Sequence, residues 1–159
     1  MYFSFKTDEV ELSNGRITTR DIIDHPGAVA ILPLLPDGRI ALVKQYRYSV
    51  GKELLEVPAG TLEKGESPDI CARRELREET GFTSGSIKRL FSFYVAPGYS
   101  NEKIHLFAAS ELKSGKKQAE EDESIKVEIY GYEELLKMID ENVIEDAKTI
   151  VAILAFLTK

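Results

Sequence analysis

The chain has 159 residues, of which 43% are hydrophobic and 30% charged, and it carries a net charge of −6 at pH 7. These proportions are typical of one globular domain with a sizeable core. The negative charge argues against a nonspecific nucleic-acid binder, which needs a basic surface, and a polyanionic substrate would require local cations.

The single cysteine, Cys71, excludes an intrachain disulfide, and inside a predicted helix we expect it to be a packed thiol and not a nucleophile. The first residues lack the basic and then apolar pattern of a signal peptide, and no apolar run is long enough to span a membrane. We therefore expect a cytoplasmic protein with no membrane partner and no nucleic-acid partner.

The N-terminal part is predicted to form a small antiparallel sheet. Residues 2–5, 10–12 and 16–23 have the composition of short strands, and Asn14 followed by Gly15 is typical of a two-residue hairpin turn. A sheet this small has to pack on the core or on a partner subunit to be stable.

The rest of the chain mixes strands and helices. Strands are predicted over residues 28–32, 39–43, 53–60, 87–95, 103–109 and 125–131, and helices over residues 68–80, 132–139 and 144–157. Residues 113–124 are polar and predict a surface loop. We expect one α+β domain over residues 1–159 with mixed sheets, in which residues 1–26 are an N-terminal antiparallel strand extension and residues 27–159 the core.

The helix over residues 68–80 is strongly acidic. Ser67 suits the N-cap, Pro68 the first helical position and Gly81 the left-handed residue at the C-terminal end. Three glutamates share one helix face because they are spaced at i, i+3 and i+4, namely Glu75, Glu78 and Glu79. Such a face is either solvated and balanced by nearby arginines or a site for a hard divalent cation, which prefers oxygen ligands.

The spacing around this helix decides between the two interpretations. The sequence matches the Nudix box at Gly60, Glu66, Arg74, Glu75, Leu76, Glu78, Glu79, Gly81 and Phe82. The chain therefore resembles the Nudix hydrolases, and the resemblance covers about residues 27–158. It implies the Nudix α/β/α sandwich, with mixed β-sheets and the box helix at its centre.

Other segments resemble the ADP-ribose pyrophosphatases within this family. They are residues 97–102, residues 25–29, residues 45–47 and the N-terminal extension. The resemblance implies Mg²⁺-dependent hydrolysis of ADP-ribose to AMP and ribose 5-phosphate, with Mn²⁺ or another divalent ion as a possible replacement. It also implies a homodimer in which the N-terminal strands of each subunit help to form the substrate site of the other.

The resemblance implies roles for individual residues. The implied metal ligands are Glu75, Glu79 and the backbone carbonyl of Ala59, with Glu78 and Glu123 as further ligands. The implied catalytic group is Glu121 as general base, chosen among four acids at 120–123, together with Glu78 and with Arg74, which orients the glutamates. The implied substrate-binding residues are Arg47 at the diphosphate, Glu102 at the terminal ribose hydroxyls, and Pro97 and Gly98 in the loop. For Arg47 an ordinary surface arginine and for Glu102 a surface salt bridge remain as alternatives.

Two other functions remain open. The substrate could be a different nucleoside diphosphate derivative, such as a nucleotide sugar, NADH or a dinucleoside polyphosphate. The chain could also be a noncatalytic Nudix ligand-sensing module, although a sensor has no need for a complete set of box glutamates.

Overall fold

The computed structural model describes residues 3–115 and 125–156. The strands are β1 (Ser4–Glu11), β2 (Ile17–Asp24), β3 (Ala28–Pro33), β4 (Ile40–Arg47), β5 (Lys52–Glu56), β6 (Ala59–Thr61), β7 (Phe82–Tyr94), β8 (Lys103–Ser114) and β9 (Lys126–Tyr130). The helices are α1 (Pro68–Thr80), α2 (Tyr132–Asp140) and α3 (Ala147–Phe156).

The strands form three sheets with the orders β1-β2, β6-β3-β8-β7 and β5-β4-β9. β3 pairs with β8 in parallel, whereas the other pairs are antiparallel, so the four-stranded sheet is mixed. This arrangement confirms the predicted α+β class with mixed sheets.

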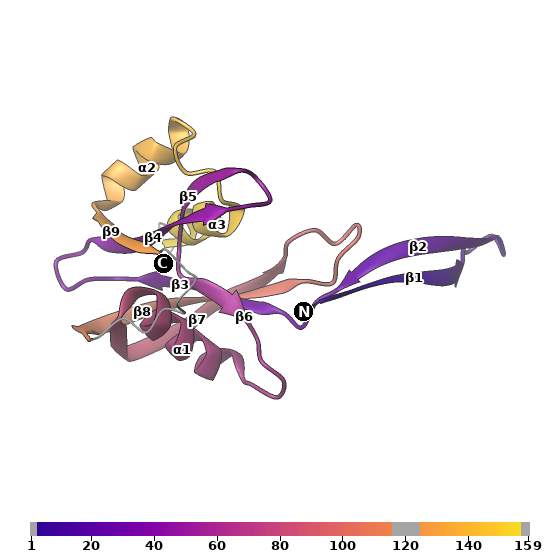
Figure 1. Ribbon diagram of the computed structural model, residues 1–159, viewed down its shortest axis with the longest axis horizontal. Coiled ribbons are helices and arrows are strands. Elements are labelled where there is room, and N and C mark those ends of the chain that lie inside the picture. Colours follow the sequence, from indigo (N-terminus) through magenta and orange to yellow (C-terminus); the bar gives the residue numbers. More distant parts are fainter. Residues whose placement is uncertain (1–2, 116–124, 157–159) are drawn as a thin grey trace.

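The central strand β3 is buried on both faces because helices cover it from two sides. Val29 and Ile31 point toward α1, where they pack with the buried Leu76. Ala30 and Leu32 point the other way, toward β4 and α3. Figure 1 shows α1 below β3 and β6, and α2 and α3 above these two strands. The result is the expected sandwich, with the acidic helix on one outer layer.

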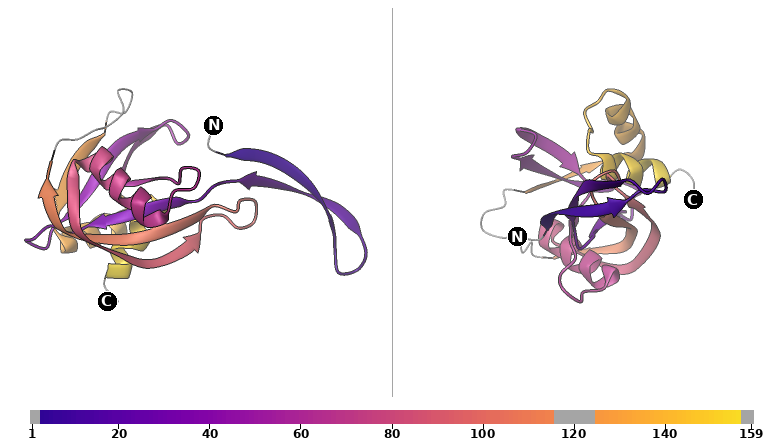
Figure 2. Two further views of the ribbon diagram at one scale, coloured as in Figure 1. Left: turned by 90° about the horizontal axis from the view of Figure 1, so that it is seen from below. Right: turned by 90° about the vertical axis from the view of Figure 1, so that its right-hand side faces the viewer.

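The N-terminal hairpin of β1 and β2 extends away from the rest of the molecule (Figure 2). Gly27 adopts a left-handed backbone (φ 98°) between β2 and β3, where the chain changes direction. The hairpin touches the body through Ile23, whose N–H donates to the carbonyl of Tyr99 at 2.8 Å, and through a bridge between Ile23 and Ser100.

The hairpin differs from its prediction in two details. Residues 4–5 and 10–11 of the two predicted strands belong to one strand, β1. The turn is longer than two residues, because Leu12 donates to the carbonyl of Arg16 at 2.9 Å and encloses three residues between them. Gly15 supplies the left-handed residue (φ 79°) that a three-residue loop requires.

The predicted strand over residues 53–60 is wrong, since the chain breaks between two sheets. β5 belongs to the sheet of β4 and β9, while β6 pairs with β3 in the other sheet. Pro58 lies in the break, where the absence of an N–H suits a residue outside the ladder. After this change of sheet, β6 leads through a turn to the start of helix α1. None of the described helices is long and apolar enough to cross a membrane.

Candidate active site

Helix α1 is bounded largely as its sequence predicts. Pro68 lies in the first turn, and the N–H of Gly81, with φ 75°, donates to the carbonyl of Arg77. Ser67 precedes the helix with an extended backbone, but its side chain makes no capping hydrogen bond. Ser67 therefore occupies the predicted N-cap position, but its hydroxyl takes no part in the cap, and Pro68 favours the first turn.

Arg74 joins the turn before α1 to the carboxylates on the helix. Its Nε and Nη2 donate to the two carboxylate oxygens of Glu66 at 3.0 and 2.9 Å. Its Nη1 donates to Glu75 at 2.6 Å and to Glu78 at 3.0 Å. These bonds lower the pKa of Glu66 to about 2 and raise the pKa of Arg74. One cation thus holds three carboxylates that would otherwise repel one another.

Glu75 lies directly against the backbone of Gly60. A Cβ atom placed on Gly60 would be 1.9 Å from the carboxyl carbon of Glu75. Burial raises the pKa of the Glu75 carboxyl, while the charge of Arg74 opposes this effect. The position needs glycine because any side chain there would displace the carboxylate.

The backbone between β5 and β6 is fixed at three successive residues. The N–H of Val57 donates to Oγ1 of Thr149 at 2.8 Å, and the carbonyl of Pro58 accepts an N–H from β3 at 2.9 Å. The N–H of Ala59 donates to Oε2 of Glu79 at 3.1 Å. Glu79 is buried, so its carboxylate is held beside the segment that carries the Ala59 carbonyl.

A second ionic cluster lies on β4, β5 and α3. Nε and Nη2 of Arg47 each donate to one oxygen of Glu56 at 2.7 Å, and Nζ of Lys148 also binds Glu56. The side chain of Glu56 is only 1% exposed. Hydrogen bonding to Glu56 is the main cause that raises the pKa of Arg47, and the nearby charge of Glu79 adds to it. Arg47 therefore lies close enough to the box helix to feel its carboxylates.

A cavity of about 340 Å³ opens between β7, β8 and the start of α3. Its lining is mainly apolar and aromatic, and it includes Glu102, Asp146 and Lys148. Glu102 thus shares a cavity with a lysine that binds Glu56, so the predicted ribose-binding carboxylate and the Arg47 cluster are neighbours.

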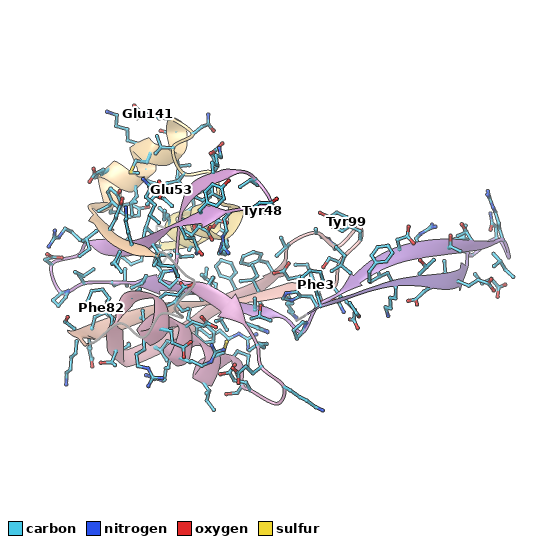
Figure 3. The ribbon with its side chains drawn as sticks, in the orientation of Figure 1. Phe3, Tyr48, Glu53, Phe82, Tyr99 and Glu141 are labelled. Atoms are coloured by element: carbon cyan, nitrogen blue, oxygen red, sulfur yellow. The ribbon has the colours of Figure 1, made fainter. Side chains whose placement is uncertain are left out.

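The loop that joins β7 to β8 carries the exposed Pro97 and Gly98. Figure 3 shows Tyr99 on this loop and Phe3 near it, where the hairpin meets the body. Asn101 fixes the loop to the end of β2, since its Oδ1 accepts the N–H of His25 at 2.7 Å. Glu121 and Glu123, expected as the base and as an extra metal ligand, lie outside the described residues.

Comparison with known proteins places this site in a family. A sequence model of the NUDIX domain matches residues 24–152. The chain belongs to the Nudix family. It is 43% identical over 148 residues to an ADP-ribose pyrophosphatase of Bacillus subtilis (strain 168), covering 92% of this chain and 80% of that protein.

Other Nudix relatives carry different names. A methanol dehydrogenase activator of Bacillus methanolicus is 41% identical over 150 residues, covering 93% of this chain and 81% of that one. A GDP-mannose pyrophosphatase of Yersinia enterocolitica is 39% identical over 142 residues, covering 82% and 73%. A solved ADP compounds hydrolase superposes with a TM-score of 0.86 at 22% identity, covering 98% of this chain and 85% of that one, which supports the Nudix fold.

The Nudix site offers hard oxygen donors to a divalent cation. The carboxylates of Glu75 and Glu79 and the carbonyl of Ala59 belong to segments that contact one another, and Gly60 leaves space for the Glu75 carboxylate. Within residues 3–115 and 125–156, no group of three histidine, cysteine or acidic side chains is close enough to form a complete metal cage. The donor chemistry nevertheless fits Mg²⁺ or Mn²⁺, which prefer carboxylate and carbonyl oxygens.

Sequence analysis of the Nudix site missed the residues that support it from outside the box. Glu56, Lys148, Asp146 and Thr149 hold Arg47 and the backbone of Val57. Glu56, a glutamate between apolar residues and three positions before Ala59, was the available signal, because a carboxylate that becomes buried has to be paired. Its partners could not be chosen, since Lys148 is 92 residues away in the chain.

Proposed function

We propose that this Nudix hydrolase cleaves the diphosphate of ADP-ribose to AMP and ribose 5-phosphate. The observation that carries the proposal is the box geometry, in which Glu75 lies against Gly60 and Glu79 beside Ala59. The substrate class is supported by similarity to proteins named ADP-ribose pyrophosphatase, at 43% identity in Bacillus subtilis and 39% in Mycobacterium tuberculosis.

The side chains of the site have separate tasks in this reaction. A bound divalent ion supplies charge neutralisation at the diphosphate oxygens and lowers the pKa of an attacking water. Glu75, Glu79 and the Ala59 carbonyl hold that ion, and Glu78 is a further ligand. Arg74 orients Glu75 and Glu78 through its Nη1. Removal of the proton from water is assigned to Glu121, which stays a prediction.

The substrate is positioned by residues outside the helix. Arg47 presents a planar guanidinium to the diphosphate, a geometry that suits phosphate oxygens. Glu102 accepts hydrogen bonds from the terminal ribose hydroxyls in the cavity beside α3, and the loop with Pro97 and Gly98 closes one side. An aromatic and apolar lining with a few polar groups is typical of a small-molecule site.

We also propose three properties that go with this activity. Mg²⁺ is the natural ion, because it prefers carboxylate and carbonyl oxygens together with phosphate. The chain is one Nudix domain with a hairpin extension and forms a homodimer through that hairpin. It acts in the cytoplasm. Its one cysteine is buried and free, so the fold does not depend on a disulfide or on an oxidising compartment.

Hydrolysis of GDP-mannose or a similar nucleotide sugar is the second candidate function. It is favoured by the relative named GDP-mannose pyrophosphatase, which is 39% identical over 142 residues. Purified protein should be incubated with Mg²⁺ and with ADP-ribose, GDP-mannose, NADH or diadenosine polyphosphates, and the products separated by chromatography. We expect AMP and ribose 5-phosphate to form fastest. Faster release of GMP from GDP-mannose would make GDP-mannose the preferred substrate in place of ADP-ribose. Binding without any turnover would favour a ligand sensor.

Replacement of Glu79 tests the metal site. Glu79→Gln keeps the shape of the side chain but removes the charge that holds the cation, so we expect kcat to fall at least about 10²-fold with an unchanged melting temperature. Asp69→Asn is the matched control, because Asp69 is an exposed acid on the same helix. Wild-type turnover in Glu79→Gln would contradict the metal role. Calorimetric titration with Mn²⁺ should also show weaker metal binding by Glu79→Gln than by Asp69→Asn.

A further inference from the structure

Glu56 is a buried carboxylate that binds two cations. Its side chain is 1% exposed, and its two oxygens accept hydrogen bonds from Nε and Nη2 of Arg47 at 2.7 Å. Nζ of Lys148 binds the same carboxylate. A carboxylate this deeply buried must stay paired, so the guanidinium of Arg47 is held in one orientation.

The pair leaves Arg47 able to bind a second anion. Glu56 occupies two of the five N–H donors of the guanidinium, and the remaining donors point away from that carboxylate. The side chain of Arg47 is 40% exposed although its partner is buried. Arg47 also lies within the electrostatic reach of Glu79 on the box helix. The nearness of Glu79 supports a place for these free donors at the diphosphate.

The start of α3 supports this pair from behind. Lys148 is 14% exposed and donates to Oδ1 of Asp146 at 2.9 Å as well as to Glu56. Oδ2 of Asp146 accepts from the N–H of Thr149 at 3.0 Å and from its hydroxyl at 2.6 Å, and this hydroxyl accepts from the N–H of Val57. One short segment of α3 thus reaches Glu56 and the backbone that follows it.

We propose that Glu56 is a positioning residue, which holds Arg47 at the diphosphate of the substrate and is itself kept in place by Lys148 of α3. The inference rests on the proposed function, because it needs Arg47 to contact the diphosphate. The cluster contains two cations and two carboxylates, so it is neutral as a whole. Loss of the Glu56 charge leaves Arg47 without its carboxylate partner and beside Lys148, which then pairs only with Asp146, and the guanidinium turns away from its working orientation.

The test replaces Glu56 by glutamine and measures binding separately from catalysis. The dissociation constant of ADP-ribose is determined by calorimetry in the presence of a chelator, and KM and kcat are determined with Mg²⁺. We expect Glu56→Gln to raise the dissociation constant and KM about tenfold, equal to about 1.4 kcal/mol, while kcat changes less than about threefold. Glu145→Gln is the matched control, because Glu145 pairs with Lys52 at the surface between β5 and the segment before α3.

A double-mutant cycle separates positioning from a general structural role. In an Arg47→Ala background, Glu56→Gln should change KM less than about twofold, because the residue through which it acts is absent. If Glu56→Gln alone does not fold, Glu56→Gln combined with Lys148→Met keeps the charge of the cluster constant, and we expect the same tenfold increase in KM, on the order of 1.4 kcal/mol.

The outcomes distinguish this inference from the proposed function. If the wild-type protein cleaves a different diphosphate, the substrate assignment changes. The ratio of KM between Glu56→Gln and wild type, measured with that diphosphate, then still tests the positioning role. An unchanged KM in Glu56→Gln, or an equal penalty with and without Arg47, overturns the positioning role alone. A wild type that neither binds nor cleaves any diphosphate overturns both.

Discussion

Gly60 has no space for a side chain, because the Glu75 carboxyl carbon would lie 1.9 Å from a Cβ atom placed there. Glycine is therefore required because the Glu75 carboxylate lies so close to the backbone. An unusual backbone is not the reason, since φ of Gly60 is not positive. The Glu75 carboxylate can keep its place only while residue 60 has no side chain.

Gly60→Ala should therefore inactivate the protein without unfolding it. The methyl group would push the Glu75 carboxylate by about 1 Å or more, and a displacement of this size costs about 10²-fold in kcat/KM. The melting temperature should fall by only a few degrees, roughly what a change of about 1 kcal/mol produces. Gly131→Ala is a suitable control, because a Cβ at Gly131 meets no atom within 4 Å. Equal activity in the two variants would contradict the close approach.

At the scale of single residues, the sequence predicts side-chain contacts within one turn of α1 but not contacts between residues far apart in the chain. The contact of Arg74 with Glu78 follows from helical spacing, because residues four apart lie on one helix face, whereas the contact with the adjacent Glu75 does not follow from that spacing. The contacts of Glu56 with Lys148 depend on how α3 packs on β5, which no local pattern specifies. Burial of Glu56 is predictable in hindsight, but its partners are a tertiary property.

Between elements, the ion pair of Glu66 and Arg74 ties the turn after β6 to helix α1. Arg74 lowers the pKa of Glu66 to about 2 from an ordinary value of 4.5. Because the pKa is lower in the folded state, the pair stabilises the fold above about pH 4.5, and this contribution is lost as the pH falls toward 2. The turn and the helix should therefore separate more easily in acid.

Glu66→Gln tests this linkage. After a discount for solvent screening, we expect the variant to unfold about 2 kcal/mol more easily than wild type near neutral pH. The difference should shrink to less than about half near pH 2.5, where wild type has lost most of the same contribution. Urea unfolding at both pH values gives the comparison, with Glu63→Gln as an exposed carboxylate in the same turn. A constant difference across this range would contradict the assignment.

The limits of elements show the same division between local and distant causes. Gly81 and Pro68 predict the ends of α1 closely, since each acts through its own backbone, whereas Asn14 and Gly15 predict the place of the hairpin turn but not its length. The apolar run over residues 53–60 predicts one strand because pattern alone cannot reveal a change of sheet. Pro58 was the available signal, as proline cannot donate to a ladder.

At the scale of the whole molecule, the hairpin exposes two large apolar side chains on one face, with the polar pairs Thr7–Asp21 and Glu9–Thr19 between them. Phe5 is 70% exposed and Ile17 62% exposed. Phe5 pairs with Ile23 and Ile17 with Glu11, so these side chains lie on the same face of the hairpin. A two-stranded sheet has little stability alone, which supports the proposed burial of this face in a second copy.

We expect the wild type to be a dimer in light-scattering and sedimentation experiments. Phe5→Glu should weaken the dimer at least about tenfold, because a charge would be buried in an apolar contact. Lys6→Glu places a carboxylate on the opposite face of β1 and should leave the dimer intact. A wild type that remains monomeric at high concentration, or equal dissociation by both variants, would contradict assembly through this face.

The attachment of the hairpin has an evolutionary consequence. The end of β2 is held by the loop of Pro97 and Gly98, through Tyr99 and through Asn101. The same loop adjoins the cavity that contains Glu102. With the loop bordering the substrate and the hairpin forming the dimer, as proposed, a relative that changes this loop would also move its hairpin, so substrate selectivity and assembly would change together.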